Sequence, residues 1–250
     1  MIDPQALPSA PTGQPQVLPL GMDAFLVRFA PVFAPQANRA ALALGEQARS
    51  LAGVTEVLPA LTSTMVRFDI PETTDRATAR AALQQLVDSR DWLALPDAPA
   101  RRAWTLPLSF DGDDAPGLAH AAEQAGISET RAVEQILAAK PRVLAIGFAP
   151  GQPYMGLLPE NWDFPRQGTL SQVPAGALVA AIRQLVLFAN PSPTGWVQVA
   201  RTSFRPFTAG ASDPTPLRAG DEIRFARASA DELAGLADHP LGGATQQDLT

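Results

Sequence analysis

Cysteine is absent from the 250 residues, and histidine occurs only twice, as His120 and His239. A chain without cysteine forms no disulfide, no thiolate metal site and no cysteine nucleophile. Two histidines leave little for imidazole chemistry, so we expect neither a metal site nor a serine-histidine triad. Because 46% of the residues are apolar, the chain can still bury a core without cross-links.

Positive charge is also scarce. Nineteen basic residues stand against 25 acidic ones, for a net charge of −6, and lysine occurs once, at Lys140. Residues 118–133 have the spacing of a helix-turn-helix, but the surrounding charges are mostly acidic. Such a helix would be repelled by a phosphate backbone, so we expect a structural pair of helices and no nucleic-acid partner.

Long apolar runs are missing as well. The most apolar stretch, residues 177–189, is interrupted by Arg183 and Gln184, so we expect no membrane span. The first sixteen residues carry four prolines and have neither a basic start nor an apolar signal region. We therefore expect a flexible tail over residues 1–16 and a cytoplasmic protein.

A small α+β domain is predicted for residues 17–98. Apolar residues recur with the 3.6-residue period of a helix between Ala37 and Leu51. Runs of residues typical of β-strands lie on both sides of this segment. The elements expected are a strand at 25–29, a helix at 35–51, strands at 54–58 and 65–70, and a helix at 75–88. This order, β-α-β-β-α, is typical of a sheet with helices on one face.

A second domain is predicted for residues 99–227, after a proline-rich linker. Two helices are expected within it, at 116–125 and 129–139, and short strands alternate with Gly and Pro clusters through most of the rest. Many short strands with such turns favour a closed barrel or a sandwich. Residues 228–250 carry four acids and no base, and we expect an acidic C-terminal tail that starts with a short helix.

The densest motif lies at residues 146–159, where three glycines and three prolines follow a predicted strand. This composition predicts a rigid loop that holds its exposed groups in place. A barrel corner built from tight turns is the alternative interpretation. The loop carries more apolar side chains than a small barrel can bury, so we expect some of them to form a surface patch.

Three polar side chains among the later strands are candidates for a site: Arg166, Gln184 and Arg201. A guanidinium offers a planar fork of donors that suits a carboxylate or a phosphate, and an amide both donates and accepts. The alternative is a surface salt bridge for each arginine and a core position for the neighbouring Trp196.

Several motifs together carry a resemblance to a known family. They are Gly53-Val-x-Glu-Val-x-Pro59, Gly147-Phe148-x-Pro150-Gly151-x-Pro153-Tyr154, Pro165-Arg166, Gln184, Ser192-Pro-x-Gly-Trp196 and Arg201-Thr202. In this order, over residues 17–225, they resemble the family of 5-oxoprolinase B subunits. The same family is described as allophanate hydrolase subunit 1, carboxyltransferase subdomains C and D, or sporulation-kinase inhibitor.

The resemblance implies a small α+β domain followed by a cyclophilin-like β-barrel. It also implies a component of a hydrolase, inactive alone, that works with a larger C subunit of the carboxyltransferase A/B type and with an A subunit. The complex opens a cyclic amide, 5-oxoproline, to glutamate and uses ATP with magnesium, at a site shared with the partner or on it.

Site residues follow from the same resemblance. The catalytic residues implied are Arg166, Gln184 and Arg201. The residues implied for substrate binding or for the interface with the partner are Phe148, Pro150, Gly151, Tyr154, Trp196 and Thr202.

The sequence departs from the family pattern in four places, one of which is the missing second Pro-Arg pair near Leu170-Ser171. A usual histidine is replaced by Ile136, an aromatic residue by Gln152, and the stretch Gly-Gly-Gln-Thr-Gly by Ile182-Arg183-Gln184-Leu185-Val186. The last change adds side chains where a backbone could approach a ligand. One alternative is a non-catalytic module that holds a partner protein or inhibits a histidine kinase. Another is a carboxyltransferase component of the allophanate hydrolase or urea carboxylase type.

Overall fold

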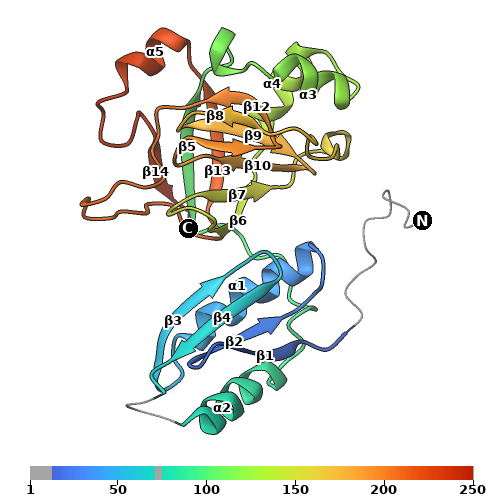
Figure 1. The fold of residues 1–250 in the computed structure, drawn as a ribbon, viewed down its shortest axis with the longest axis vertical. Helices are drawn as coiled ribbons and strands as arrows, with labels where there is room; N and C mark the ends of the chain where they lie inside the picture. Colours follow the sequence, from blue (N-terminus) through green and yellow to red (C-terminus); the bar gives the residue numbers. More distant parts are fainter. Residues whose placement is uncertain (1–12, 71–74, 250) are drawn as a thin grey trace. The chain divides into compact units, whose positions relative to one another are not determined.

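The fold is mixed α/β. In a computed structural model, which describes residues 13–70 and 75–249, the chain divides into two compact units, residues 1–99 and 100–250 (Figure 1). Most of the flexible tail expected at residues 1–16 lies outside the described residues, and from Gln16 the chain is a strand. None of the helices in the described ranges combines the length and apolar character that a bilayer span requires.

The N-terminal unit is a four-stranded antiparallel sheet with two helices. Its elements are β1 (Gln16–Leu20), β2 (Ala24–Arg28), α1 (Pro35–Ala48), β3 (Val54–Pro59), β4 (Ser63–Phe68) and α2 (Arg76–Asp88). The strand order is β1-β2-β4-β3. The sequence pattern predicted every element but β1. That strand contains Pro19, which a sheet accepts because β1 lies at its edge.

One face of this sheet forms the core. Phe25, Val27, Val66 and Phe68 alternate along β2 and β4 with residues that point the other way, and they pack with α1 and α2. In Figure 1, α1 lies behind the strands. Helix α2 begins after Asp75, whose carboxylate accepts a hydrogen bond from the Thr78 amide at 2.9 Å.

The C-terminal unit holds most of the strands. In chain order it contains β5 (Arg102–Leu108), η1 (Gly112–Asp114), α3 (Leu118–Gln124), α4 (Glu129–Ala138), β6 (Arg142–Ile146), β7 (Pro153–Gly156), η2 (Glu160–Trp162), β8 (Ser171–Val173), β9 (Ala177–Ala181), β10 (Gln184–Leu187), β11 (Ser192–Thr194), β12 (Val197–Arg201), β13 (Glu222–Arg227), α5 (Ala230–Gly235) and β14 (Thr245–Asp248). Eight strands form one sheet, and β8 and β11 form a separate pair.

The strands of residues 100–249 do not form the expected closed barrel. The large sheet has the order β12-β9-β10-β7-β6-β13-β5-β14, so β12 and β14 are its two edges. One bridge, Ser109 to Arg201, links the end of β5 to the end of β12 through hydrogen bonds of 2.9 and 3.0 Å. Pairing stops there because β14 takes the remaining edge of β5 and because the Gly117 amide, just before α3, donates to the carbonyl of Gln198 in β12.

The prediction that residues 228–250 form a tail after a short helix is also wrong in part. The short helix is present as α5, but residues 245–248 form β14, which pairs antiparallel with residues 102–105 of β5. The side chains of β14 are all exposed, so its sequence shows no apolar alternation. Backbone hydrogen bonds, which leave no trace in the residue pattern, hold it in the sheet.

Candidate functional site

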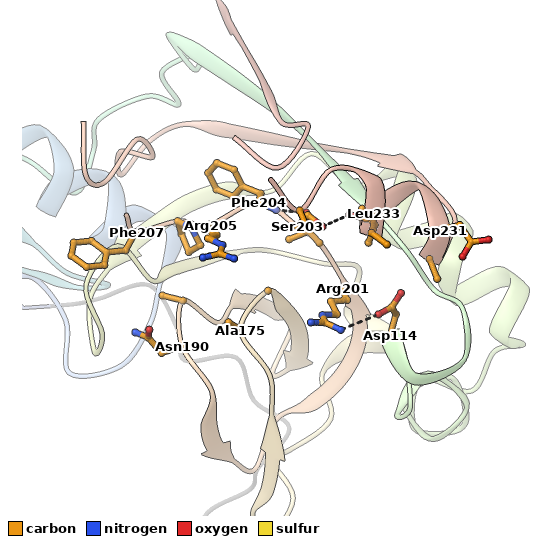
Figure 2. A pocket seen from close by; sticks show the side chains of 17 residues that line it. Asp114, Ala175, Asn190, Arg201, Ser203, Phe204, Arg205, Phe207, Asp231 and Leu233 are labelled. Atoms are coloured by element: carbon orange, nitrogen blue, oxygen red, sulfur yellow. Dashed lines mark hydrogen bonds and ion pairs between the residues drawn. The ribbon is translucent and has the colours of Figure 1, made fainter. Parts of the chain in front are cut away.

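A cleft of about 710 Å³ opens in the C-terminal unit (Figure 2). Residues 201–207, which begin at the last residue of β12, form one wall. The other walls come from Ala175 and Gly176 before β9, from Ala189 and Asn190 after β10, and from α5. Segments far apart in the sequence therefore build the cleft.

An ion pair lies at one end of the cleft. Nη1 of Arg201 is 3.6 Å from Oδ1 of Asp114, and the two side chains are 45% and 12% exposed. This distance exceeds that of a hydrogen bond, so Asp114 orients the guanidinium without using its donors. Arg201 can therefore still bind a ligand in the cleft.

A second arginine, Arg205, also lines the cleft, and the view in Figure 2 draws it on the same side of Arg201 as Asn190 and Phe207. Arg205 is exposed, and no carboxylate of residues 13–70 and 75–249 lies within 4.0 Å of its guanidinium. Two guanidiniums with donors available to a ligand make the cleft suited to an anion.

The wall between these arginines is held by close backbone contact. Gly176 has φ +80°, and a Cβ there would lie 2.2 Å from the carbonyl oxygen of Thr202. The two residues also share a hydrogen bond, from the Thr202 amide to the Gly176 carbonyl, at 2.9 Å. Only glycine allows this approach, which explains the turn at residues 173–176.

The opposite wall is fixed by hydrogen bonds of α5. Oγ of Ser203 donates to the carbonyl of Leu233 at 2.7 Å. The helix starts with a capping box between Ser229 and Glu232. The amide and the hydroxyl of Ser229 both donate hydrogen bonds to the Glu232 carboxylate. These bonds, the amide's more than the hydroxyl's, lower the pKa of that carboxyl.

Three of the predicted site residues form a separate cluster of aromatic and cationic groups. The rings of Tyr154 and Trp196 meet edge to face with centroids 6.4 Å apart, and Cζ of the exposed Arg166 lies 5.0 Å from the centroid of Trp196. Trp196 is buried and Tyr154 is half-buried. The cation-π contact orients Arg166 while its guanidinium stays in solvent.

Gln184 lies beside this cluster rather than in the cleft. It pairs with Gly156 of β7, and its neighbour Val186 pairs with Tyr154, so Gln184 and Tyr154 share one face of the sheet. The side chain of Gln184 is buried, with its Cγ 3.5 Å from the position of a Cβ on Gly156.

The Gly/Pro-rich loop at residues 146–159 connects the cleft with the aromatic and cationic cluster. A Cβ on Gly151 would lie 2.2 Å from the carbonyl oxygen of Pro206, so the loop packs directly on the wall of the cleft. Phe148 has φ +68° and is 82% exposed, whereas Met155 and Leu158 are buried in the core. Of the loop's large apolar side chains, Phe148 is the one that forms a surface feature.

The structure thus brings some predicted residues together and separates others. Arg201 and Thr202 line the cleft, Tyr154, Trp196 and Arg166 form the cluster, and Gly151 connects them. Sequence reasoning missed Asp114, Asn190, Ser203 and Arg205. The one available signal was Arg205, an arginine four residues after Arg201 in a segment with no helix or strand pattern.

The donor set of the cleft fits a carboxylate or phosphoryl group better than a metal ion. Its charged side chains are the two arginines with Asp114 and Asp231. In the ranges that the structure describes, no three Asp, Glu, His or Cys side chains are grouped so that they could hold a metal. An anion bound here would be positioned by the two guanidiniums.

Comparisons with known proteins agree with this architecture. A 5-oxoprolinase B subunit of Escherichia coli O157:H7 is 30% identical over 185 residues, which is 73% of this chain and 82% of that protein. A 5-oxoprolinase B subunit of Bacillus subtilis (strain 168) is 28% identical over 224 residues, 86% of this chain and 93% of that protein.

Solved structures show the same fold. A crystal structure of TTHA0988 superposes with a TM-score of 0.67 at 28% identity, over 83% of this chain and 40% of that chain. The Kluyveromyces lactis urea carboxylase superposes with a TM-score of 0.67 at 15% identity, over 94% of this chain and 24% of that enzyme. This chain therefore spans well under half the length of either structure.

A family model described as "Carboxyltransferase domain, subdomain C and D" matches residues 15–217, which extend over most of both units and include the cleft arginines. This match covers most of the chain. The protein therefore belongs to the carboxyltransferase subdomain C and D family.

Proposed function

We propose that this chain is the B subunit of a complex that opens 5-oxoproline to glutamate with hydrolysis of ATP. The relatives named as 5-oxoprolinase B subunits match it over 82% and 93% of their own lengths. The observation that carries the proposal is the cleft that holds Arg201 and Thr202, both drawn from the family motif, together with Arg205.

For this reaction the cleft binds the substrate carboxylate, which lies next to the amide that is opened. One guanidinium binds the substrate carboxylate, and Arg201, oriented by Asp114, stabilises the negative charge that develops when the amide oxygen is activated. Opening the ring also requires ATP. We assign its metal-bound phosphates to the partner C and A subunits, because the cleft holds no carboxylate cluster for magnesium in the described part of the chain.

Reconstitution tests this function. The chain is combined with its C and A subunits, and ATP-dependent glutamate release is measured. Arg201→Lys keeps the charge but loses the donor fork, so we expect kcat/KM to fall at least tenfold, about 1.4 kcal/mol of transition-state stabilisation. Arg131→Ala, which removes an exposed arginine of α4, is the matched control and leaves kcat/KM unchanged.

The isolated chain is a second test, because we expect it to show no ATP hydrolysis above background. It lacks a Walker A sequence and a glycine-rich kinase loop. Steady-state turnover by the single chain, or glutamate release that does not depend on it, contradicts the proposed role in the complex.

The second candidate is a non-catalytic module that holds a partner protein. It is favoured by Ile182 and Arg183, which form the tight turn between β9 and β10 at φ +45° and +61°, where glycine is usual. Side chains at these two positions prevent the backbone from approaching a ligand as closely as glycine would allow. Partner binding without any glutamate release in the reconstituted mixture supports this candidate over the first.

The finer description of the C-terminal unit is also a proposal. We infer that this unit, although its eight-stranded sheet is open at β12 and β14, corresponds to the cyclophilin-like domain that the family resemblance implies. The bridge between Ser109 and Arg201, which brings the ends of β5 and β12 together, supports this correspondence.

A further inference from the structure

The N-terminal sheet carries an unusual row of apolar side chains. Leu18 pairs with Leu26, Leu26 with Met65, and Met65 with Leu58, so the row crosses all four strands in direct register. We call these four residues the apolar row. Residues paired in this way have their side chains on the same face of a sheet.

The apolar row lies on the face away from the core. None of its members belongs to the core cluster of this unit or packs against it. Both helices contact the other face, and within the described residues of this unit no helix covers the row. Leu58 is 52% exposed, whereas the other three members of the row are partly exposed. Leu20, which follows Leu18 on the same face, is 43% exposed.

Single exposed apolar residues are ordinary, but a continuous row across a whole sheet is not. Its flanks differ in charge. One flank carries Arg28, whose guanidinium donates to Gln16. The other carries Arg67 between Asp23 and Glu56, at 2.7 and 2.9 Å, with a net charge of one negative unit.

We propose that the apolar row is a homodimer interface, on which a second copy of the chain lays its own row about a two-fold axis parallel to the row. This axis places the Arg28 flank of each copy over the acidic flank of the other. An axis in the sheet plane but perpendicular to the row would instead oppose Arg28 to Arg28. Charge complementarity therefore selects both the occupant and its orientation.

The size of the surface sets the strength of the dimer. Four strands about 4.8 Å apart and five residues of about 3.3 Å each give a patch of roughly 300 Å². A standard stable interface buries about 800 Å² on each partner, so this dimer is weak and depends on concentration. The interface is independent of the proposed catalytic cleft, which lies in the other unit.

Sedimentation equilibrium of the full chain tests the dimer over concentrations from roughly 1 µM to 1 mM. We expect a reversible monomer-dimer equilibrium. Leu58→Lys places a charge in the row and raises the dissociation constant at least tenfold. Val32→Lys is the matched control, because Val32 is an equally exposed apolar residue of the same unit, 49% exposed, outside the row, and the variant leaves the constant unchanged.

A charge reversal tests the orientation. Arg28→Glu opposes two acidic flanks, so the dissociation constant rises about two- to fivefold, and the rise shrinks at high salt. A wild-type chain that remains monomeric at the highest concentration overturns the dimer. So does a dimer that Leu58→Lys leaves intact. If the wild type is monomeric and Leu58→Lys no longer binds the C subunit, the row belongs to that partner instead, which also overturns the homodimer.

Discussion

The two units of this protein bury their sheets differently. In the N-terminal unit the strands alternate buried and partly exposed residues, and the helices of this unit cover one face of the sheet. In the C-terminal unit β9 and β10 are buried at every position. A sheet covered on one side tolerates substitutions on its other face and leaves that face for a partner. A sheet covered on both sides depends on close packing of its side chains and backbone. The cleft is built from such close contacts.

The largest expected effect comes from Gly176→Ala in the wall of the cleft. The new Cβ would lie 2.2 Å from the Thr202 carbonyl oxygen at a residue with φ +80°. We expect the free energy of unfolding to fall by more than about 2 kcal/mol, because backbone rather than a flexible side chain blocks the Cβ. Chemical denaturation measures the change.

The matched control is Gly45→Ala in α1 of the N-terminal unit. Its new Cβ would lie 3.0 Å from the side chain of Pro59, which is tight but can relax. Alanine also favours a helix over glycine by about 1 kcal/mol, so the net change should stay within about 1 kcal/mol of zero. Equal losses in the two variants would remove the contrast between the units.

The next effect concerns the exposed loop residue Phe148. Phe148→Gly removes an 82% exposed ring and relieves a backbone at φ +68°. We expect the melting temperature to be kept while the affinity for the C subunit falls more than tenfold, about 1.4 kcal/mol. Leu170→Ala, which removes another exposed apolar side chain, is the control. Unchanged affinity in Phe148→Gly would show that the loop does not contact this partner.

A smaller effect, of opposite sign, is expected at the turn between β9 and β10. Ile182 is β-branched and has φ +45°, a region that asparagine tolerates much better. Ile182→Asn should raise the free energy of unfolding by about 1 kcal/mol. Ile182→Val keeps the branching and the strain, so it should give no gain. A loss of stability in Ile182→Asn would mean that the packing of the partly exposed Ile182 side chain outweighs the strain.

The smallest effect is the pH dependence of helix capping, for which each unit offers one carboxylate. The hydroxyl and amide of Thr78 lower the pKa of Asp75, and Ser229 lowers that of Glu232. A carboxyl with a lowered folded pKa stabilises the native state above its ordinary pKa, 3.8 for Asp75 and 4.5 for Glu232, and this contribution disappears as the pH falls through the lower folded value.

An NMR titration of the carboxyl groups measures both values. We expect midpoints below 3.8 and 4.5, with the amide signals of α2 and α5 changing in parallel. Asp75→Asn should remove the acid-dependent change in α2 alone. A midpoint at or above the ordinary value for either residue would contradict the hydrogen bonds that cap its helix.

Prediction from sequence succeeded where local pattern decides structure. Both helices of the N-terminal unit, three of its four strands and the two short helices before β6 follow from apolar spacing and helix caps. The pattern failed at β7, where Pro153 and Gly156 indicate a loop, and at β14, whose side chains are all exposed. Both strands exist because neighbouring strands offer backbone hydrogen bonds, which single-sequence patterns do not record.

The candidate site divides in the same way. The donor chemistry of Arg166 and Arg201 and the rigidity of the Gly/Pro-rich loop could be inferred from residue types and spacing. The spatial arrangement of these residues could not be inferred. Arg201 faces Asp114 and shares a cleft with Arg205, whereas Arg166 lies on the ring of Trp196. Gln184 lies within the large sheet. Contacts between segments distant in the sequence depend on strand order and on where glycine lets backbones touch.

The sequence by itself therefore determined the family, the secondary structure of the first unit and the cationic donor chemistry of the candidate site, because these depend on local spacing and side-chain type. Only the tertiary structure decided that the large sheet stays open at β12 and β14 and that the predicted site residues separate into a cleft and a cluster. It also decided that four apolar residues line up across the first sheet. These outcomes depend on pairing register, which long-range packing sets.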